Sequence, residues 1–405
     1  MNPGVDDLKA AFPIFASAPR PFHYLDNAAT SQICRPALEA LLRFEGQERA
    51  NVKRGVYRLA DAATRAYEQA RSRIAAYIGA SKPREIVFTS GATLALNMAA
   101  HLLEPRLGRG DHILVSVAEH HSNLVPWQMA AERRGARLTA LAVDREGRIR
   151  IAELERHLTA RTRIVALTHI SNVTGLITDL RPVAEAAHRV GAVLVVDGAQ
   201  GPPHGPLLVR ELGCDLYAFS AHKMFAATGA GVLWIREELL DELPPFLGGG
   251  EMVARVTIPQ TRYAEAPRRF EAGTPPIGPI LALGAAAEWL MGLDWTVIRG
   301  RERALLDKLL HELSRLSGVR LVGPCESEGR VGIVAFVVDG VHPHDVCQML
   351  DQLGLCLRGG HHCAQPLMDA FGVEATVRAS LAPYNDEEDI DALVEGLRWT
   401  IRRLR

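Results

Sequence analysis

Short apolar runs alternate with amphipathic stretches along the chain between about residues 84 and 236. Seven of the apolar runs predict strands, which cover residues 86–89, 112–116, 137–143, 163–169, 192–197, 215–219 and 231–235. The stretches between them predict helices at residues 94–103, 124–134, 151–157 and 180–190. This alternation is typical of a mostly parallel sheet with helices on both faces. Polar motifs at the carboxyl ends of such strands are expected to line one crevice.

The second half of the chain has a different pattern. Residues 243–279 are rich in glycine and proline and predict long loops, which in compact proteins are usually functional or interfacial. A helix-rich stretch follows, and then short strands and helices alternate at 320–322, 332–338, 344–353, 355–358 and from 386 onward. We therefore predict an α/β fold with a large domain, residues 22–290, and a smaller α+β domain formed by residues 1–21 and 291–405.

Composition excludes several classes of protein. The 405 residues are 48% hydrophobic and 23% charged, with a formal net charge of −1, so neither nucleic acid nor an anionic membrane is an expected partner. No uncharged apolar run reaches the ~18 residues that a membrane span needs. The first 20 residues lack the pattern of a signal peptide. Six dispersed cysteines without a CxxC pair favour a reduced, cytoplasmic chain over a disulfide framework.

Two residues at successive strand ends suggest cofactor chemistry. Asp197 ends one apolar run, and Lys223 follows the next, between aromatic and small residues. Pyridoxal phosphate chemistry needs both groups, because a lysine forms a Schiff base with the cofactor aldehyde and an aspartate keeps the pyridinium nitrogen protonated. Desolvation would lower the pKa of this lysine and favour a reactive amine. Each residue alone could equally be a turn residue, and it is their joint occurrence that is informative.

Other strand ends carry motifs with both a functional and an ordinary interpretation. Gly91, Ala92 and Thr93 could cradle a phosphate at a helix N-terminus, although the motif alone favours a plain turn with a threonine cap. His120 could stack on a planar ring and shuttle protons, or be a capping residue. Asn172 could bind a substrate carboxylate or the cofactor phenolic oxygen, or form an Asx turn.

The loop 358–366 contains the candidate nucleophile. Cys363 follows two glycines and two histidines, where neighbouring Arg358 and histidine would lower a thiol pKa. A buried structural thiol is the ordinary alternative, and a metal site is a weak third, because adjacent side chains rarely converge on one ion. Arg378 interrupts an apolar strand, which is costly unless it meets a carboxylate such as that of an amino-acid substrate.

Together these motifs resemble the class V aminotransferase group of fold-type I pyridoxal phosphate enzymes. The resemblance is greatest to the second type of cysteine desulfurase, a branch that includes cysteine sulfinate desulfinases and selenocysteine lyases. It rests on nine segments in order along nearly the whole chain: 24–30, 51–55, 119–127, 169–173, 196–200, 219–223, 269–275, 358–366 and 378–380. The sequence departs from the family pattern at Tyr57, where relatives often carry histidine, and at Ala92, where many carry threonine.

The resemblance implies roles for these residues. Lys223 is expected to be the Schiff-base lysine and proton shuttle, Cys363 the nucleophile that becomes a persulfide, and His120 the ring-stacking residue. The expected cofactor-binding residues are Ala92, Thr93, His120, Asn172, Asp197, Gln200, Ser220, His222 and Lys223, with Thr274 from a neighbouring subunit. The expected substrate-binding residues are Asn172, Arg358 and Arg378, and no metal is expected.

The resemblance therefore implies a homodimeric desulfurase that converts L-cysteine to L-alanine and passes sulfur to an acceptor protein of iron–sulfur cluster assembly. The alternatives are a selenocysteine lyase, a cysteine sulfinate desulfinase or another class V lyase, none of which needs a thiol nucleophile. A sulfur-relay scaffold without turnover is a further hypothesis, and the joint presence of Lys223, Asp197, His120 and Cys363 argues against it.

Overall fold

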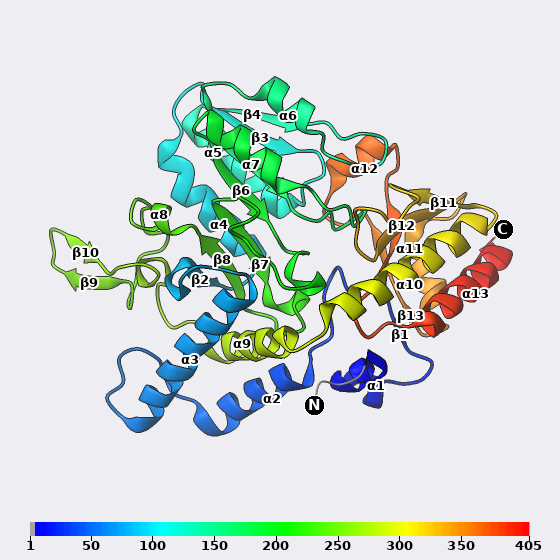
Figure 1. Ribbon diagram of the computed structural model, residues 1–405, viewed down its shortest axis with the longest axis horizontal. Helices are drawn as coiled ribbons and strands as arrows, with labels where there is room; N and C mark the ends of the chain where they lie inside the picture. Colours follow the sequence, from blue (N-terminus) through cyan, green and yellow to red (C-terminus); the bar gives the residue numbers. More distant parts are fainter. Residues whose placement is uncertain (1–4, 405) are drawn as a thin grey trace.

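A seven-stranded sheet forms the centre of the computed structural model, which describes residues 5–404 (Figure 1). The strands lie in the order β2-β8-β7-β6-β5-β3-β4. Their bounds are β2 (Ile86–Thr89), β3 (His112–Ser116), β4 (Arg137–Leu141), β5 (Thr162–Thr168), β6 (Val193–Asp197), β7 (Leu216–Ser220) and β8 (Gly231–Ile235). Neighbours from β4 to β7 pair in parallel, and β8 runs antiparallel to both β7 and β2. The predicted mixed, mostly parallel sheet is thus confirmed.

Helices cover both faces of this sheet because successive side chains of each strand point to opposite sides. In β7, Tyr217 and Phe219 join one apolar core, and Leu216 and Ala218 join another. The first core includes α3 (Arg58–Tyr77), α7 (Leu180–Arg189) and α9 (Ile277–Met291), and the second includes α4 (Ala92–Leu103) and α5 (Val125–Arg134). Both faces are buried, which explains why the strands read as continuous apolar runs.

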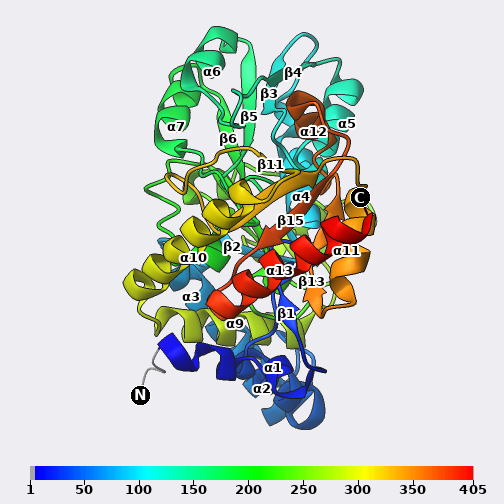
Figure 2. The same ribbon diagram turned by 90° about the vertical axis from the view of Figure 1, so that its right-hand side faces the viewer.

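A smaller antiparallel sheet lies beside the large one. It has the order β11-β12-β15-β14. The bounds in this part of the chain are α10 (Trp295–Arg315), β11 (Val319–Val322), β12 (Ile333–Val338), α11 (Pro343–Asp351), β13 (Leu355–Cys356), β14 (Arg358–Gly360), α12 (Gln365–Phe371), β15 (Thr376–Ser380) and α13 (Glu387–Leu404). Figure 2 shows α10, α11 and α13 on this sheet, whereas α12 reaches over to the large sheet. There Leu367 and Met368 pack with Ala118 and Val173.

Several elements differ from the sequence prediction. The single strand expected at 355–358 is two strands, because β13 pairs with β1 (His23–Tyr24) and β14 pairs with β15. The expected long loop at 243–279 contains an exposed hairpin of β9 (Val253–Val256) and β10 (Thr261–Tyr263), which projects from the body in Figure 1. Helices α2 (Arg35–Arg43) and α3 were not predicted. Other elements are α1 (Ile14–Ser17), α6 (Ile151–His157) and α8 (Glu237–Leu240).

The N-terminal segment contacts both halves of the chain. The ring of Phe12 lies 5.6 Å from Phe225 and from Trp289, and 4.5 Å from Tyr384. The division into residues 22–290 and residues 1–21 with 291–405 stays a prediction. Across residues 5–404 no single helix is long and apolar enough to cross a membrane, and only the bent pair α9 and α10 would reach that length together.

Candidate active site

One cavity of about 200 Å³ lies at the carboxyl ends of the large-sheet strands, under the loop that follows β14. Every predicted site residue except Thr274 lines it. These are Ala92, Thr93, His120, Asn172, Asp197, Gln200, Ser220, His222, Lys223, Arg358, Cys363 and Arg378. Residues far apart in the sequence converge here because parallel strands end at the same edge.

Lys223 and Asp197 reach this cavity from neighbouring strands. Asp197 is the last residue of β6, and Lys223 ends the 3₁₀ turn η7 (Ala221–Lys223) that follows β7. Burial lowers the pKa of Lys223 to about 8; Asp197 opposes this shift, whereas Arg378 and Arg358 add to it. Burial likewise raises the pKa of Asp197, whose Oδ1 accepts a hydrogen bond from Ala199 N at 2.9 Å. The lysine amine is therefore readily deprotonated, as a nucleophile must be.

The turn before α4 is open enough to receive an anion. Gly91 is the N-cap of α4, with φ of 154° and no side-chain cap, so the predicted threonine cap is absent. A Cβ on Gly231 would lie 2.4 Å from Gly91 Cα, so a larger residue at 231 would displace this turn. Ala92 N donates to Ser220 Oγ at 2.7 Å, and Thr93 lies beside it in the first turn. Hydroxyls and helix N–H groups together suit a phosphate.

His120 occupies the cavity in its neutral form. Burial lowers its pKa to about 3, and the charge of Lys223 adds to this shift. Its Nδ1 accepts from Ser122 N at 3.1 Å, which places the proton of the neutral ring on Nε2. The next residue back, Glu119, is fully buried and accepts from Asn123 Nδ2 at 2.7 Å and Thr168 N at 3.1 Å. Sequence reasoning gave Glu119 no role, although a charged residue three positions after a buried apolar strand was a usable signal.

Arg378 meets a carboxylate, as its buried position requires, but that carboxylate belongs to the chain itself. Its Nη2 lies 2.9 Å from Asp26 Oδ1, and its Nη1 donates to Asn172 O at 2.9 Å. Asn172 Nδ2 in turn donates to His362 O at 2.8 Å, and Gln200 Nε2 donates to the carbonyl of Ala28. The side-chain amides of Asn172 and Gln200 therefore bind backbone carbonyls that lie next to the cavity. Asp26, which pairs with Arg378, is a site-forming residue that sequence reasoning missed.

Cys363 is half-buried and faces the same cavity as Lys223. Of the other cysteines, Cys34 and Cys214 are buried and Cys325 is exposed, and none of them lines the cavity. The interpretation of Cys363 as a purely structural core thiol is therefore not supported by its position. Within residues 5–404 no group of three or more histidine, cysteine, aspartate or glutamate residues is arranged to hold a metal ion.

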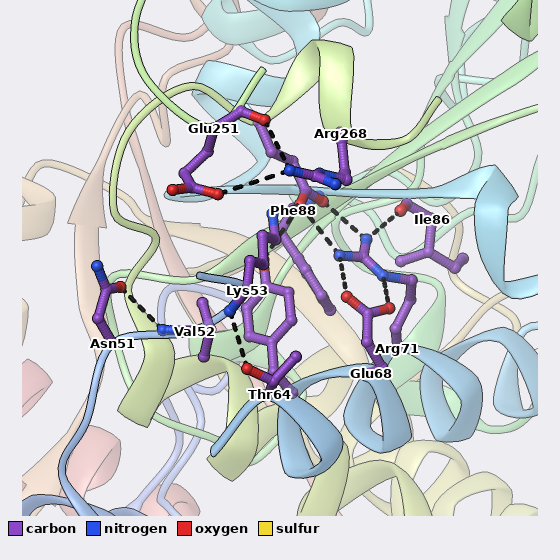
Figure 3. Close-up of polar contacts among 12 residues, drawn as sticks. Asn51, Val52, Lys53, Thr64, Glu68, Arg71, Ile86, Phe88, Glu251 and Arg268 are labelled. Atoms are coloured by element: carbon purple, nitrogen blue, oxygen red, sulfur yellow. Dashed lines mark hydrogen bonds and ion pairs between the residues drawn. The ribbon is translucent and has the colours of Figure 1, made fainter. Parts of the chain in front are cut away.

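Thr274 is exposed and lies outside the cavity, in a segment that a buried ion cluster anchors. Figure 3 shows Lys53, Arg71 and Phe88, which belong to this cluster. Glu271, three residues before Thr274, pairs with Arg71 at 2.7 Å and with Lys53 at 3.0 Å. It also accepts from Tyr67 OH at 3.2 Å and from the backbone N of Phe88, in β2, at 2.9 Å. The cluster thus connects the segment before Thr274 to α3 and to the strand that precedes the Gly91 turn.

Comparisons with known proteins agree with this geometry. The family model described as aminotransferase class-V matches residues 23–393. A probable cysteine desulfurase of Halalkalibacterium halodurans is 44% identical, with 97% of each chain covered, and a cysteine desulfurase of Cronobacter sakazakii is 40% identical, with 98% of each covered. The crystal structure of the Escherichia coli cysteine desulfurase CsdA, an S-sulfonic acid form, is 39% identical with a TM-score of 0.92 over 99% of both chains. The apo structure of the cysteine desulfurase of Thermococcus onnurineus is 37% identical, with a TM-score of 0.93 over 98% of both chains. These matches confirm the predicted fold and resemblance: the chain belongs to the class V aminotransferase family, in its cysteine desulfurase branch.

Proposed function

We propose that this enzyme uses pyridoxal phosphate to convert L-cysteine to L-alanine and leaves the sulfur on Cys363 as a persulfide. The observation that carries the proposal is the position of the Cys363 thiol in the cavity that also holds Lys223 and Asp197. A lyase that needs no thiol nucleophile has no use for a cysteine there. Supply of sulfur to an acceptor protein of iron–sulfur cluster assembly and a homodimer completed by Thr274 belong to the same proposal.

Family membership implies pyridoxal phosphate, and the residues present fit it. Lys223 would hold the cofactor aldehyde, Asp197 the ring nitrogen, and His120 the ring face. Ala92, Thr93, Ser220 and His222 would hold the phosphate, as the open helix N-terminus and its hydroxyls allow. When bound, the cofactor supplies an electron sink for the bonding electrons that the substrate releases.

The chain's own groups then account for the transfer of sulfur. Arg378 and Arg358 provide positive charge for the substrate carboxylate, with Asn172 beside them. Lys223 Nζ, whose pKa is about 8, takes the Cα proton and returns it to the product. The Cys363 thiolate attacks the substrate sulfur, so that an S–S bond forms as the S–Cβ bond breaks. The net change is cysteine plus a thiol giving alanine plus a persulfide, and no external oxidant is required.

The test compares purified wild type with Cys363→Ala, Lys223→Ala and a matched control, Cys325→Ala, which removes an exposed cysteine outside the cavity. Wild type and the control are expected to form alanine from L-cysteine. Wild type is also expected to gain one sulfur in mass at Cys363, and both other variants should lose turnover. If Cys363→Ala forms alanine at the wild-type rate, the proposal is wrong and a thiol-independent lyase takes its place. Selenide or sulfinite release would identify that lyase only if Cys363→Ala also keeps alanine formation from L-cysteine, because release of these products needs no thiol.

A further inference from the structure

The turn that carries Cys363 has a backbone that needs support from outside. His362 and Cys363 both have positive φ angles, 53° and 56°, a region that residues other than glycine disfavour. Within the turn, Ala364 N donates to His361 O at 2.9 Å, and Cys363 N donates to His361 Nδ1 at 3.0 Å. From outside the turn, Asn172 Nδ2 donates to His362 O at 2.8 Å, and His362 Nε2 lies 2.9 Å from Thr376 Oγ1. Both of these contacts hold His362 and not Cys363 or the residues that follow it.

His121 supplies a contact on each side of the thiol. It is the first residue of the 3₁₀ turn η5 (His121–Asn123), which follows β3 of the large sheet. Its backbone N donates to Cys363 O at 2.7 Å, and its ring Nε2 accepts from the backbone N of Gln365 at 3.3 Å. The ring also lies 5.6 Å from that of His361. One residue of the large sheet thus holds the turn both at Cys363 and two residues after it.

The side-chain contact has a clear physical reason. Gln365 is the first residue of α12, so its N–H has no partner within the helix. The N-cap, Ala364, offers no side-chain acceptor, and the His121 ring takes that role. Burial, with the nearby His361, lowers the pKa of His121 and so favours the neutral ring. The hydrogen bond that Nε2 accepts from Gln365 N then places the proton of the neutral ring on Nδ1.

We propose that His121 is a positioning residue for the Cys363 thiol, separate from the cofactor-stacking role of its neighbour His120. This inference rests on the proposed function, because a position for the thiol matters only if the thiol takes up sulfur. Loss of the His121 ring should loosen the turn while the cavity residues stay in place. Sulfur transfer to Cys363 should then slow, whereas steps that do not use the thiol should not.

The test uses the full-length holoenzyme with His121→Ala, His121→Gln and a control, His311→Ala, which removes an exposed histidine of α10 outside the cavity. Glutamine places an amide oxygen near the position of Nε2, so it is the conservative replacement. The readouts are kcat and KM for alanine formation from L-cysteine, alanine formation from cysteine sulfinate, and the rate of Cys363 alkylation by iodoacetamide. The visible absorption of the bound cofactor reports whether the rest of the site is intact.

We expect His121→Ala to lower kcat for L-cysteine about 5- to 10-fold with little change in KM, the effect of losing one hydrogen bond in the reacting geometry. Alkylation of Cys363 should be faster, and turnover of sulfinate and the cofactor absorption should match wild type. His121→Gln should recover most of the loss. Three results would each overturn the inference. The first is an equal loss of kcat with cysteine and with sulfinate in His121→Ala, and the second is no recovery of kcat for cysteine in His121→Gln. The third is turnover and Cys363 alkylation at wild-type rates in His121→Ala. Should wild type itself form no alanine from cysteine, the proposed function fails, and the alkylation rates still decide whether His121 fixes the thiol.

Discussion

Replacement of Glu271 by glutamine should destabilise this protein far more than the same change at Glu68, although both carboxylates bind Arg71. Glu271 and Arg71 have side chains that are 3% and 2% exposed, and Lys53 is 6% exposed. Glu68 is 49% exposed and meets Arg71 Nε at 2.8 Å. The two carboxylates therefore differ in burial while they share a partner, Arg71, which Figure 3 shows beside Glu68.

The expected loss of stability in Glu271→Gln follows from the buried cationic groups that lose their carboxylate partner. A glutamine at 271 can still accept from Arg71 Nη1 and Phe88 N through its oxygen, but its amide N–H groups would face Arg71 Nη2 and Lys53 Nζ. Removing one partner of a buried pair costs about 3–5 kcal/mol, because a buried charge is left uncompensated. The exposed pair at Glu68 is worth about 1 kcal/mol at most, and salt screens it.

The assay is urea unfolding of wild type, Glu271→Gln and Glu68→Gln at one protein concentration, at low and high salt. We expect the Glu271→Gln loss to persist in salt and the Glu68→Gln loss to vanish. Burial alone would raise the pKa of Glu271, but Arg71 and Lys53 lower it overall. Its contribution is therefore present above its unfolded pKa of about 4.3 and is lost as pH falls through the lower folded value. Equal, salt-sensitive losses below about 1 kcal/mol in both variants would refute the reasoning.

Further predictions concern the cavity. Because the pKa of Lys223 is about 8, about a tenth of this amine is neutral at pH 7. The rate of pyridoxal phosphate capture by cofactor-free enzyme should therefore rise with pH, with a midpoint near pH 8 and a plateau about one pH unit higher. Gly231→Ala places a Cβ against Gly91, so it should lower the free energy of unfolding by about 1–3 kcal/mol and weaken cofactor binding measured by absorption titration. Gly300→Ala, which has open space around it, should change neither quantity. His120→Ala should lower alanine formation about 10²- to 10⁴-fold in steady-state assays if the ring moves protons; a smaller loss would leave it a stacking role alone.

The sequence predicted the large sheet well because its strands, apart from the partly exposed edge strand β4, are buried on both faces and read as apolar runs. It predicted where Asp197 and Lys223 meet for the same reason, since both follow such runs. It did not predict α2 and α3, although both helices are amphipathic. The buried residues Ala60, Ala63, Tyr67, Ala70 and Ile74 of α3 recur every three or four positions, a helical spacing that was a usable signal. It also could not show that Asp26 pairs with Arg378, because that contact joins residues 352 positions apart.

One physical cause shifts the pKa values of two cavity residues, Lys223 and His120, and of Glu119, which is buried next to His120. Burial is the largest influence on Lys223, His120 and Glu119, and it moves each toward its neutral form: the lysine pKa falls to about 8, the histidine pKa falls to about 3, and the glutamate pKa rises to about 8. The loop that carries Cys363 lines the same cavity and therefore helps to exclude water from it. Water that entered through a displaced loop would shift the pKa values of Lys223 and His120, which line the cavity, upward toward their ordinary ranges. In the proposed reaction, the protonation state of Lys223 Nζ would thus depend on the position of the loop that carries Cys363.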